Sequence, residues 1–308
     1  MGVIEVLQHI RHANDTSYKI RSVTLKRFFN RSEEATNSEL YALAQKLGLR
    51  LQPKAKLSDV FKIDNSGISD EEFRYALMAH FDFLVMDEDW MPLFVVEFDG
   101  PTHQSSEQIE RDKKKDKLCK QFGLSILRID SKFIRTEVRQ MSLLAWLCKI
   151  WLFERDFSQA QEQGAIPSDE PFLWFSVMSE EAGQPVTYPY DISLPSRLYL
   201  IELFKASKTR SSAPLITTYE TADVVYAECF FRLTDDLVAM SQSSVKQFKF
   251  RGIAPCEVAE ELAVIQIAEN IKEIFQGRAE AMPMSHARAR LSAIEDKPEF
   301  RKNGEIWS

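Results

Sequence analysis

Apolar and polar positions follow both helical and strand-like patterns along the first part of the chain. In residues 38–48, leucine and alanine recur at three- and four-residue spacing behind a polar cap, and Gly48 follows, so the pattern predicts a helix. Residues 49–63 alternate between apolar and polar side chains and include a proline, which is typical of an edge strand. Residues 71–80 favour a short helical turn.

The next stretch predicts a compact strand and helix unit. Two apolar runs, 81–86 and 93–98, flank a polar turn and predict a β-hairpin. The second run is almost continuously apolar, which is typical of a central buried strand. A charged helix over 107–122, a strand over 125–129 and an amphipathic helix over 136–157 follow. The sequence does not decide whether the third strand is parallel or antiparallel.

The remaining residues predict a second α+β region. Strand-like apolar runs occupy 172–178, 198–204, 215–219 and 224–233, and an apolar stripe at helical spacing predicts a long helix over 255–275. The expected organisation is a basic helical segment, a first domain, a linker, a second domain and a loosely ordered tail. These parts cover residues 1–36, 37–157, 158–171, 172–277 and 278–308. The fold class we expect is α/β (α+β).

Composition narrows the class of protein. The chain has 308 residues, of which 44% are hydrophobic and 28% charged, with a formal net charge of −7. This composition is normal for a globular protein, and the negative charge argues against a globally basic nucleic-acid coat. The four cysteines form no C-x-x-C pair, so we expect no cysteine zinc site and a reducing cytoplasmic location. The most apolar run, 141–153, is too short to span a membrane, and no signal peptide opens the chain.

Carboxylates stand at the ends of the predicted hairpin strands. Asp82 opens the first strand and Glu97 closes the second, so an antiparallel pairing brings them to the same end of the sheet. Hard oxygen ligands bind Mg²⁺ or Mn²⁺, and the backbone carbonyl of Phe98 could complete the set. The alternative is a pair of hairpin-end carboxylates in solvent.

The local motifs resemble a known nuclease superfamily. The segments E-F-D-G-P-T-H, R-D-K-K-K-D-K and F-G-L-S-I-L-R are similar to the PD-(D/E)XK nucleases, and especially to their very-short-patch-repair-like branch. The matching positions are Asp82, Glu97, Asp99, Gly100, His103, Asp112, Lys115, Asp116, Gly123 and Arg128. The resemblance covers residues 38–157 and implies a restriction-endonuclease-like core, with a mixed central sheet flanked by helices. It also makes Glu39, on the first helix, a candidate active-site residue. Residues 158–308 resemble no family.

The sequence departs from the superfamily at the motif lysine, since Asp99 stands in its place. Lys115, Leu118, Cys119 and Phe122 share one helical face by their spacing, so Lys115 should point toward the sheet. We therefore expect Lys115 to replace the missing lysine. Asp112, one turn earlier on nearly the same side, is a further candidate contact for the metal ion or a water molecule.

The remaining candidates each have two interpretations. His103 is either a general base or phosphate contact at the mouth of the site or a residue that only caps its loop. Positive side chains of the helix and the strand after it are candidate nucleic-acid contacts. The lysines among them can form a solvated face and still follow a phosphate backbone, since the two interpretations are compatible. The positive side chains are those of Lys113, Lys114, Lys117 and Arg128.

Three functions remain open at this level. The first is a metal-dependent nuclease that hydrolyses phosphodiester bonds, with DNA as the expected partner. Repair, restriction or phage defence would be its setting by analogy alone. The second is a catalytically inactive nucleic-acid-binding subunit that retains the nuclease fold. The third is a protein-interaction module in residues 158–308, with a protein partner or a homodimer contact through residues 172–277.

Overall fold

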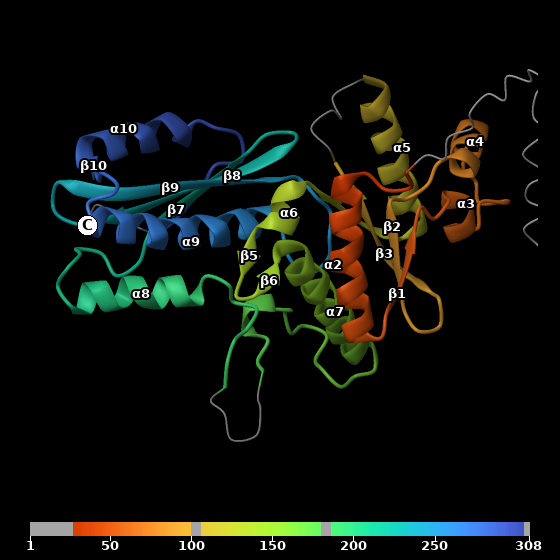
Figure 1. Ribbon diagram of the computed structural model, residues 1–308, viewed down its shortest axis with the longest axis horizontal. Coiled ribbons are helices and arrows are strands. Elements are labelled where there is room, and N and C mark those ends of the chain that lie inside the picture. The colour runs from red at the N-terminus through yellow and green to blue at the C-terminus, as the bar shows by residue number, and fades with distance from the viewer. Residues whose placement is uncertain (1–26, 100–105, 180–185, 305–308) are drawn as a thin grey trace, which may run out of the picture. The chain divides into compact units, whose positions relative to one another are not determined.

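The computed structural model describes residues 27–99, 106–179 and 186–304. The chain divides into two compact units, Met1–Arg31 and Ser32–Ser308, and the elements described below belong to the second unit from Ser32 onward (Figure 1). Most of the basic segment expected at residues 1–36 therefore lies outside the described residues. The fold is α+β, and its described residues form a mixed four-stranded sheet, an antiparallel five-stranded sheet and a two-stranded antiparallel hairpin.

The first part of this unit surrounds a four-stranded sheet. In chain order its elements are α2 (Arg31–Leu47), β1 (Arg50–Pro53), α3 (Leu57–Val60), α4 (Asp70–Met78), β2 (Phe83–Met86), β3 (Pro92–Phe98), α5 (Ser106–Phe122), β4 (Ser125–Ile129), α6 (Ser131–Arg135), β5 (Glu137–Val138), β6 (Met141–Ser142) and α7 (Leu143–Glu162). The sheet order is β1-β2-β3-β4.

The pairing of these strands explains the position of α5. β1, β2 and β3 are antiparallel neighbours, whereas β4 pairs parallel to β3, with Glu97 opposite Arg128. A parallel pair needs a crossover connection, and α5 forms it between β3 and β4. The predicted hairpin, the helix after it and the third strand are confirmed.

Alternation along the strands divides the first sheet into two faces. Leu84, Val95 and Ile126 pack with residues of α3, α4 and α5 in one core cluster, so this is the α5 face. On the opposite face, the Phe94 ring lies 4.9 Å from the Trp151 ring of α7. Even-numbered residues of β2 and β4 and odd-numbered residues of β3 therefore point toward α5.

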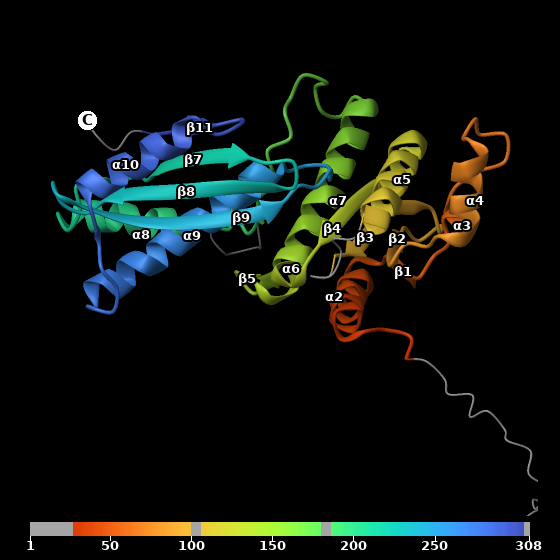
Figure 2. The same ribbon diagram turned by 90° about the horizontal axis from the view of Figure 1, so that it is seen from above.

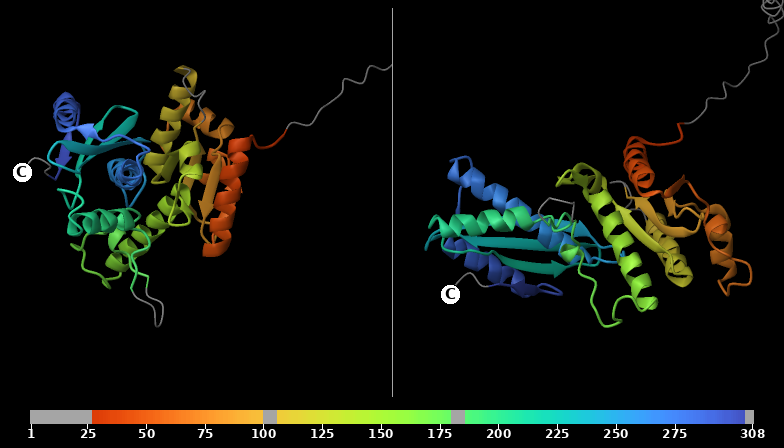
Figure 3. Two further views of the ribbon diagram at one scale, coloured as in Figure 1. Left: turned by 60° about the vertical axis from the view of Figure 1, so that its left-hand side comes forward. Right: turned by 90° about the horizontal axis from the view of Figure 1, so that it is seen from below.

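The second part surrounds a five-stranded antiparallel sheet of order β10-β9-β8-β7-β11. Its elements are η1 (Trp174–Ser176), α8 (Leu194–Lys205), β7 (Leu215–Glu220), β8 (Val224–Arg232), β9 (Leu237–Lys246), α9 (Pro255–Phe275), β10 (Met282–Pro283), α10 (Met284–Glu295) and β11 (Arg301–Asn303). α9 and α10 cover opposite faces of this sheet (Figures 2 and 3). On the α9 side, Ser241 Oγ of β9 donates to the Ala263 carbonyl.

The strand predictions for two segments of this part are wrong. Phe172–Met178 contains only the 3₁₀ turn η1, and Leu198–Phe204 lies within α8. In α8 the buried residues Leu200 and Leu203 are three positions apart, as a helix requires. A short apolar run has no period long enough to distinguish the two structures.

Element boundaries differ from expectation around the first sheet. The strand expected over 49–63 ends at Pro53, because Lys54 has a φ of 53° and breaks the extended backbone. The helix expected from Thr136 begins instead at Leu143, after the small β5–β6 hairpin, and Ser142 Oγ caps it by accepting from Ala145 N. α7 continues to Glu162, so its last turn occupies the start of the expected linker.

The loosely ordered tail predicted over 278–308 is also wrong. The described residues there form β10, α10 and β11, and α10 buries Ala287, Leu291 and Ile294 against the second sheet. The sequence pattern did not predict α10, because only three apolar residues among polar neighbours form its buried stripe. Strand β9 was missed because its serines and glutamine weaken the alternation. Among the described residues, no helix combines the length and apolar character needed to cross a membrane.

Candidate functional site

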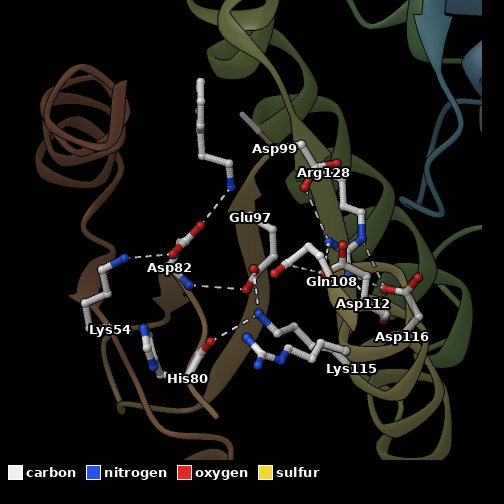
Figure 4. Close-up of polar contacts among 12 residues, drawn as sticks. Lys54, His80, Asp82, Glu97, Asp99, Gln108, Asp112, Lys115, Asp116 and Arg128 are labelled. Carbon is white, nitrogen blue, oxygen red and sulfur yellow. Dashed lines mark hydrogen bonds and ion pairs between the residues drawn. The ribbon is translucent and has the colours of Figure 1, made fainter. Parts of the chain in front are cut away.

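The β2–β3 hairpin brings two carboxylates together at one end of the first sheet. Asp82 directly precedes β2, and Glu97 is the next-to-last residue of β3 and belongs to the α5 face. The Asp82 backbone N–H donates to Glu97 Oε1 over 3.2 Å, and the Phe98 N–H donates to Asp82 Oδ2 over 3.0 Å (Figure 4). Each carboxylate is thus anchored by the backbone of the opposite strand. The predicted proximity of Asp82 and Glu97 is confirmed.

Lys115 projects from α5 toward Glu97. Its Nζ donates to Glu97 Oε2 over 2.6 Å and to the His80 carbonyl over 3.1 Å (Figure 4). The Lys115 and Glu97 side chains are only 10% and 7% exposed. Leu118 and Cys119 are buried on the same helical face. The predicted orientation of Lys115 is confirmed, and its catalytic role stays a prediction.

The environment of Glu97 makes its carboxyl unusually basic. Burial raises the pKa of Glu97, the Lys115 ammonium lowers it, and the charge of Asp82 raises it. The net pKa is about 7. A carboxylate in this position gains from any nearby positive charge, because an unpaired buried anion is costly.

A second lysine, Lys54, holds the other carboxylate. Its Nζ lies 2.8 Å from Asp82 Oδ1 and 2.6 Å from Glu33 Oε1 of α2. Burial lowers the pKa of Lys54, but its hydrogen bonds to Asp82 and Glu33 outweigh burial, and the net direction is upward. The sequence alone did not identify Lys54 or Glu33. The pairing of β1 with β2 brings Lys54 to Asp82, and that register cannot be read from the sequence.

Glu39, the candidate from α2, lies elsewhere. It accepts a 2.6 Å hydrogen bond from Ser142 Oγ, the residue that caps α7. The glutamate of α2 that reaches the carboxylate site is Glu33, six residues earlier. Sequence alone could not tell these two glutamates apart, because neither could be assigned a partner without the tertiary contacts.

Asp99 belongs to a second ionic cluster beside the first. Its Oδ1 lies 3.5 Å from Arg128 Nη1, and its Oδ2 lies 3.4 Å from Nζ of Lys246 on β9. Arg128 also contacts Asp112 at 3.2 Å and Asp116 at 2.8 Å, and its side chain is only 13% exposed. Three carboxylates thus engage Arg128, and its role in nucleic-acid binding stays a prediction. Arg128 joins β3, β4 and α5 as a buried cation.

The outward lysines of α5 match the solvated-face interpretation. Each pairs with a glutamate: Lys113 with Glu110, Lys114 with Glu71, and Lys117 with Glu72. The exposed Lys113–Glu110 pair contributes little to stability, whereas the Glu72 carboxylate is only 9% exposed. The ammonium groups of Lys113 and Lys117 remain accessible to a competing anion. His103 lies outside the described residues.

Three further polar residues surround the site, and none was singled out from the sequence. Burial, followed by the charges of Lys54 and Lys115, lowers the pKa of His80. Burial, with Glu97 and Asp112, raises the pKa of Tyr75 to about 12. Gln108 Nε2 donates to Asp112 Oδ1 over 3.4 Å. His80 and Tyr75 lie in segments without a recognisable motif, so the sequence did not indicate that they lie near the carboxylates.

The donor set fits a hard divalent cation of the Mg²⁺ class. Asp82 and Glu97 supply carboxylate oxygens, and the Phe98 N–H points toward Asp82, which in an extended strand directs the Phe98 carbonyl to the same edge. The Lys54 ammonium already places a positive charge between the carboxylates of Asp82 and Glu33. No cluster of three or more acidic, histidine or cysteine side chains suited to a metal occurs within residues 27–99, 106–179 and 186–304. Mg²⁺ commonly uses one or two carboxylates, with waters and substrate phosphate completing its shell.

A family model described as "Protein of unknown function (DUF2726)" matches residues 25–144 of the chain. Comparison with curated proteins gives no match, and no solved structure matches the chain. The matched residues include Asp82, Glu97, Asp99 and Lys115, whereas Lys246 and the whole second sheet lie outside them. The similarity therefore extends over the elements that build the carboxylate site.

Proposed function

We propose that the protein is a metal-dependent nuclease that hydrolyses phosphodiester bonds of DNA. The observation that carries the proposal is the 2.6 Å contact between Lys115 Nζ and Glu97 Oε2, beside an Asp82 anchored to the same hairpin end. A lysine next to two convergent carboxylates is the set of groups that metal-assisted phosphodiester hydrolysis needs. The lysine comes from α5 rather than from the strand position that Asp99 occupies.

Asp82 and Glu97, with the Phe98 carbonyl, would hold Mg²⁺ or Mn²⁺. When bound, such an ion polarises a phosphoryl oxygen and makes a water molecule a better nucleophile at neutral pH. The reciprocal hydrogen bonds between the hairpin strands hold both carboxylates in place before any ligand arrives. This preorganisation lowers the entropic cost of assembling the site.

Lys115 would stabilise negative charge on the scissile phosphate. Its Nζ has three donor hydrogens, and Glu97 and the His80 carbonyl accept two of them. Among the described residues no third acceptor is found, so the third hydrogen could be donated to a phosphate or water oxygen. In a site that excludes most solvent, such a donor acts more strongly on developing charge than it would in water.

The topology also supports a restriction-endonuclease-like core, which is part of this proposal. An antiparallel β1–β2–β3 unit continues through the α5 crossover into parallel β4, and helices lie on both faces. The carboxylates stand where β3 leaves the hairpin and the helix begins. That order of elements is the one which the motif resemblance implies.

A second candidate is a nucleic-acid-binding subunit without catalysis. Asp99 stands at the motif-lysine position and is engaged by Arg128 and Lys246, so it offers no substitute for a lysine. If Lys115 serves only to neutralise Glu97, the fold would bind DNA and leave it intact. The two candidates differ in one measurable property, namely metal-dependent cleavage.

Cleavage of supercoiled and linear DNA in the presence of Mn²⁺ or Mg²⁺ tests the proposal. We expect the full-length protein to nick or degrade DNA, and Glu97→Gln and Lys115→Gln to abolish this activity while circular dichroism shows retained structure. Lys120→Ala is the matched control, because Lys120 is an exposed lysine of the same helix. Equal activity of the wild-type protein and Glu97→Gln under every metal would refute catalysis and favour the binding subunit.

A further inference from the structure

A second potential ligand site lies away from the carboxylates. A cavity of about 300 Å³ is formed by the end of α2, the middle of α7 and the segment around Tyr190. Its lining includes three cationic side chains, Lys46, Lys149 and Arg155, and two aromatic rings, Phe153 and Tyr190. None of the residues of the carboxylate site lines it. Cavities of this size hold small organic molecules.

The charge in this cavity is not balanced. Arg155 pairs with Asp156 over 2.8 Å, and Asp156 is the only acidic residue of the lining. Lys46 and Lys149 form no ion pair with a carboxylate in the described part of the chain. The Lys149 Nζ instead lies 3.2 Å from the Met141 sulfur, a weak acceptor.

Lys149 and Lys46 also oppose each other. Burial lowers the pKa of Lys149, and the charge of Lys46 lowers it further. A half-buried ammonium next to a second ammonium gains when an anion enters between them. The cavity is therefore electrostatically suited to a compact anion with more than one negative charge.

The aromatic wall is held rigidly. The Tyr190 ring lies edge-to-face with Phe153 at 4.7 Å between centroids, and Lys149 Nζ lies 6.0 Å from the Tyr190 ring. Trp146 Nε1 donates to the Tyr190 carbonyl over 3.0 Å. Arg139 Nη1 donates to the carbonyls on either side, those of Tyr188 and Asp191. A fixed ring beside paired cations favours a ligand with both a planar ring and an anion.

We propose that this cavity, with Lys46 and Lys149 on the anion and Tyr190 and Phe153 against the ring, binds a nucleoside phosphate. A phosphate group carries close to two charges and three strong acceptor oxygens, which suits two ammonium groups better than one carboxylate does. The base has a planar face for the aromatic wall, and the apolar part of the lining shields it. This site is separate from the proposed nuclease chemistry and does not depend on it.

Isothermal titration calorimetry of the full-length protein with adenosine 5′-monophosphate, in EDTA, tests the site. We expect measurable binding, and both adenosine and inorganic phosphate should bind at least about tenfold more weakly, since each offers half of the contacts. Lys149→Ala and Lys46→Glu should each weaken binding by about tenfold or more. Lys46 is exposed, so its replacement leaves the fold intact. Lys120→Ala should bind like the wild-type protein.

Two results would overturn this assignment. One is no heat of binding with the monophosphate at millimolar concentration. The other is equal affinity for inorganic phosphate and the nucleotide, which would remove the ring from recognition. Short oligonucleotides with and without a 5′-phosphate distinguish the source of the ligand. If only the 5′-phosphorylated oligonucleotide displaces adenosine 5′-monophosphate, the site recognises the phosphorylated ends of strands. If neither oligonucleotide displaces it, the site recognises free nucleotides.

Discussion

Lys115 Nζ and Glu97 Oε2 form a buried ion pair 2.6 Å apart, and the two residues come from α5 and β3. Removing one member of such a pair leaves an uncompensated charge in a site of low dielectric constant, whereas removing both members leaves none. The pair thus links the helix to the sheet energetically and lies at the centre of the proposed site.

Double-mutant analysis of this pair should show strong coupling. We expect Lys115→Met and Glu97→Gln each to lower the free energy of unfolding by about 3–5 kcal/mol, and the double variant to recover a large part of that loss. Urea denaturation at about pH 8.5, where the Glu97 carboxyl with its pKa of about 7 is ionised, measures all four proteins. Additive losses in the double variant would mean that the two side chains do not depend on each other.

The capping box of α4 gives a prediction for pH. Ser69 N and Oγ both donate to Glu72 Oε2 over 2.8 Å, and Lys117 contacts the same carboxylate. The hydrogen bond from Lys117, then that from Ser69, lowers the pKa of Glu72 from 4.5 to about 2. Because the folded pKa is depressed, this stabilisation is complete above pH 4.5 and is lost as pH falls through about 2.

Glu72→Gln should therefore destabilise the protein by about 1 kcal/mol at neutral pH, with the difference shrinking toward pH 2. Urea denaturation across that range measures it. Glu71→Gln is the matched control, since Glu71 precedes it on α4 and pairs with Lys114 at the surface. A difference between Glu72→Gln and wild type that stays constant from pH 7 to pH 2 would contradict the assigned cause.

The carboxylate site was predictable where local periodicity determines it. The hairpin pattern put Asp82 and Glu97 at the same end of the sheet, and helical spacing set the face of Lys115. Lys54 and Glu33 were not predictable, because they reach Asp82 through strand register and helix packing. Lys246 lies 147 residues from Asp99 in the chain and comes from a strand that the sequence pattern did not reveal.

The second half of the fold was less predictable for a related reason. α9 has a broad apolar face over 21 residues, and its limits agree with the periodicity. α8 and α10 are 12 residues each and bury only two and three residues respectively. Such short stripes match strand and loop patterns as well as helical ones, and only packing against α9 or the second sheet selects the helix.

Lys246 supplies a test of whether the second sheet contributes to DNA binding. Its Nζ lies 3.4 Å from Asp99, and 37% of its side chain remains exposed, so it can also reach a phosphate. We expect Lys246→Ala to weaken DNA binding and to reduce the slope of log affinity against log salt by about 0.9, the value for one phosphate contact. Fluorescence anisotropy over a salt series measures this slope. Lys208→Ala, an exposed lysine after α8, should leave it unchanged. Equal slopes for wild type and Lys246→Ala would exclude this contact.

In the proposed metal site, Lys54 would compete with the ion for Asp82. Its ammonium bonds to Asp82 Oδ1 and Glu33 Oε1, so a cation that binds these oxygens must displace it. Lys54→Ala should therefore bind Mn²⁺ about three- to tenfold more tightly than the wild-type protein, a gain of roughly 0.7–1.4 kcal/mol. Calorimetric titration with Mn²⁺ measures the affinity. Lys56→Ala, two residues away and exposed, is the control and should show wild-type affinity. Weaker Mn²⁺ binding by Lys54→Ala would mean instead that the lysine holds Asp82 in the orientation the metal requires.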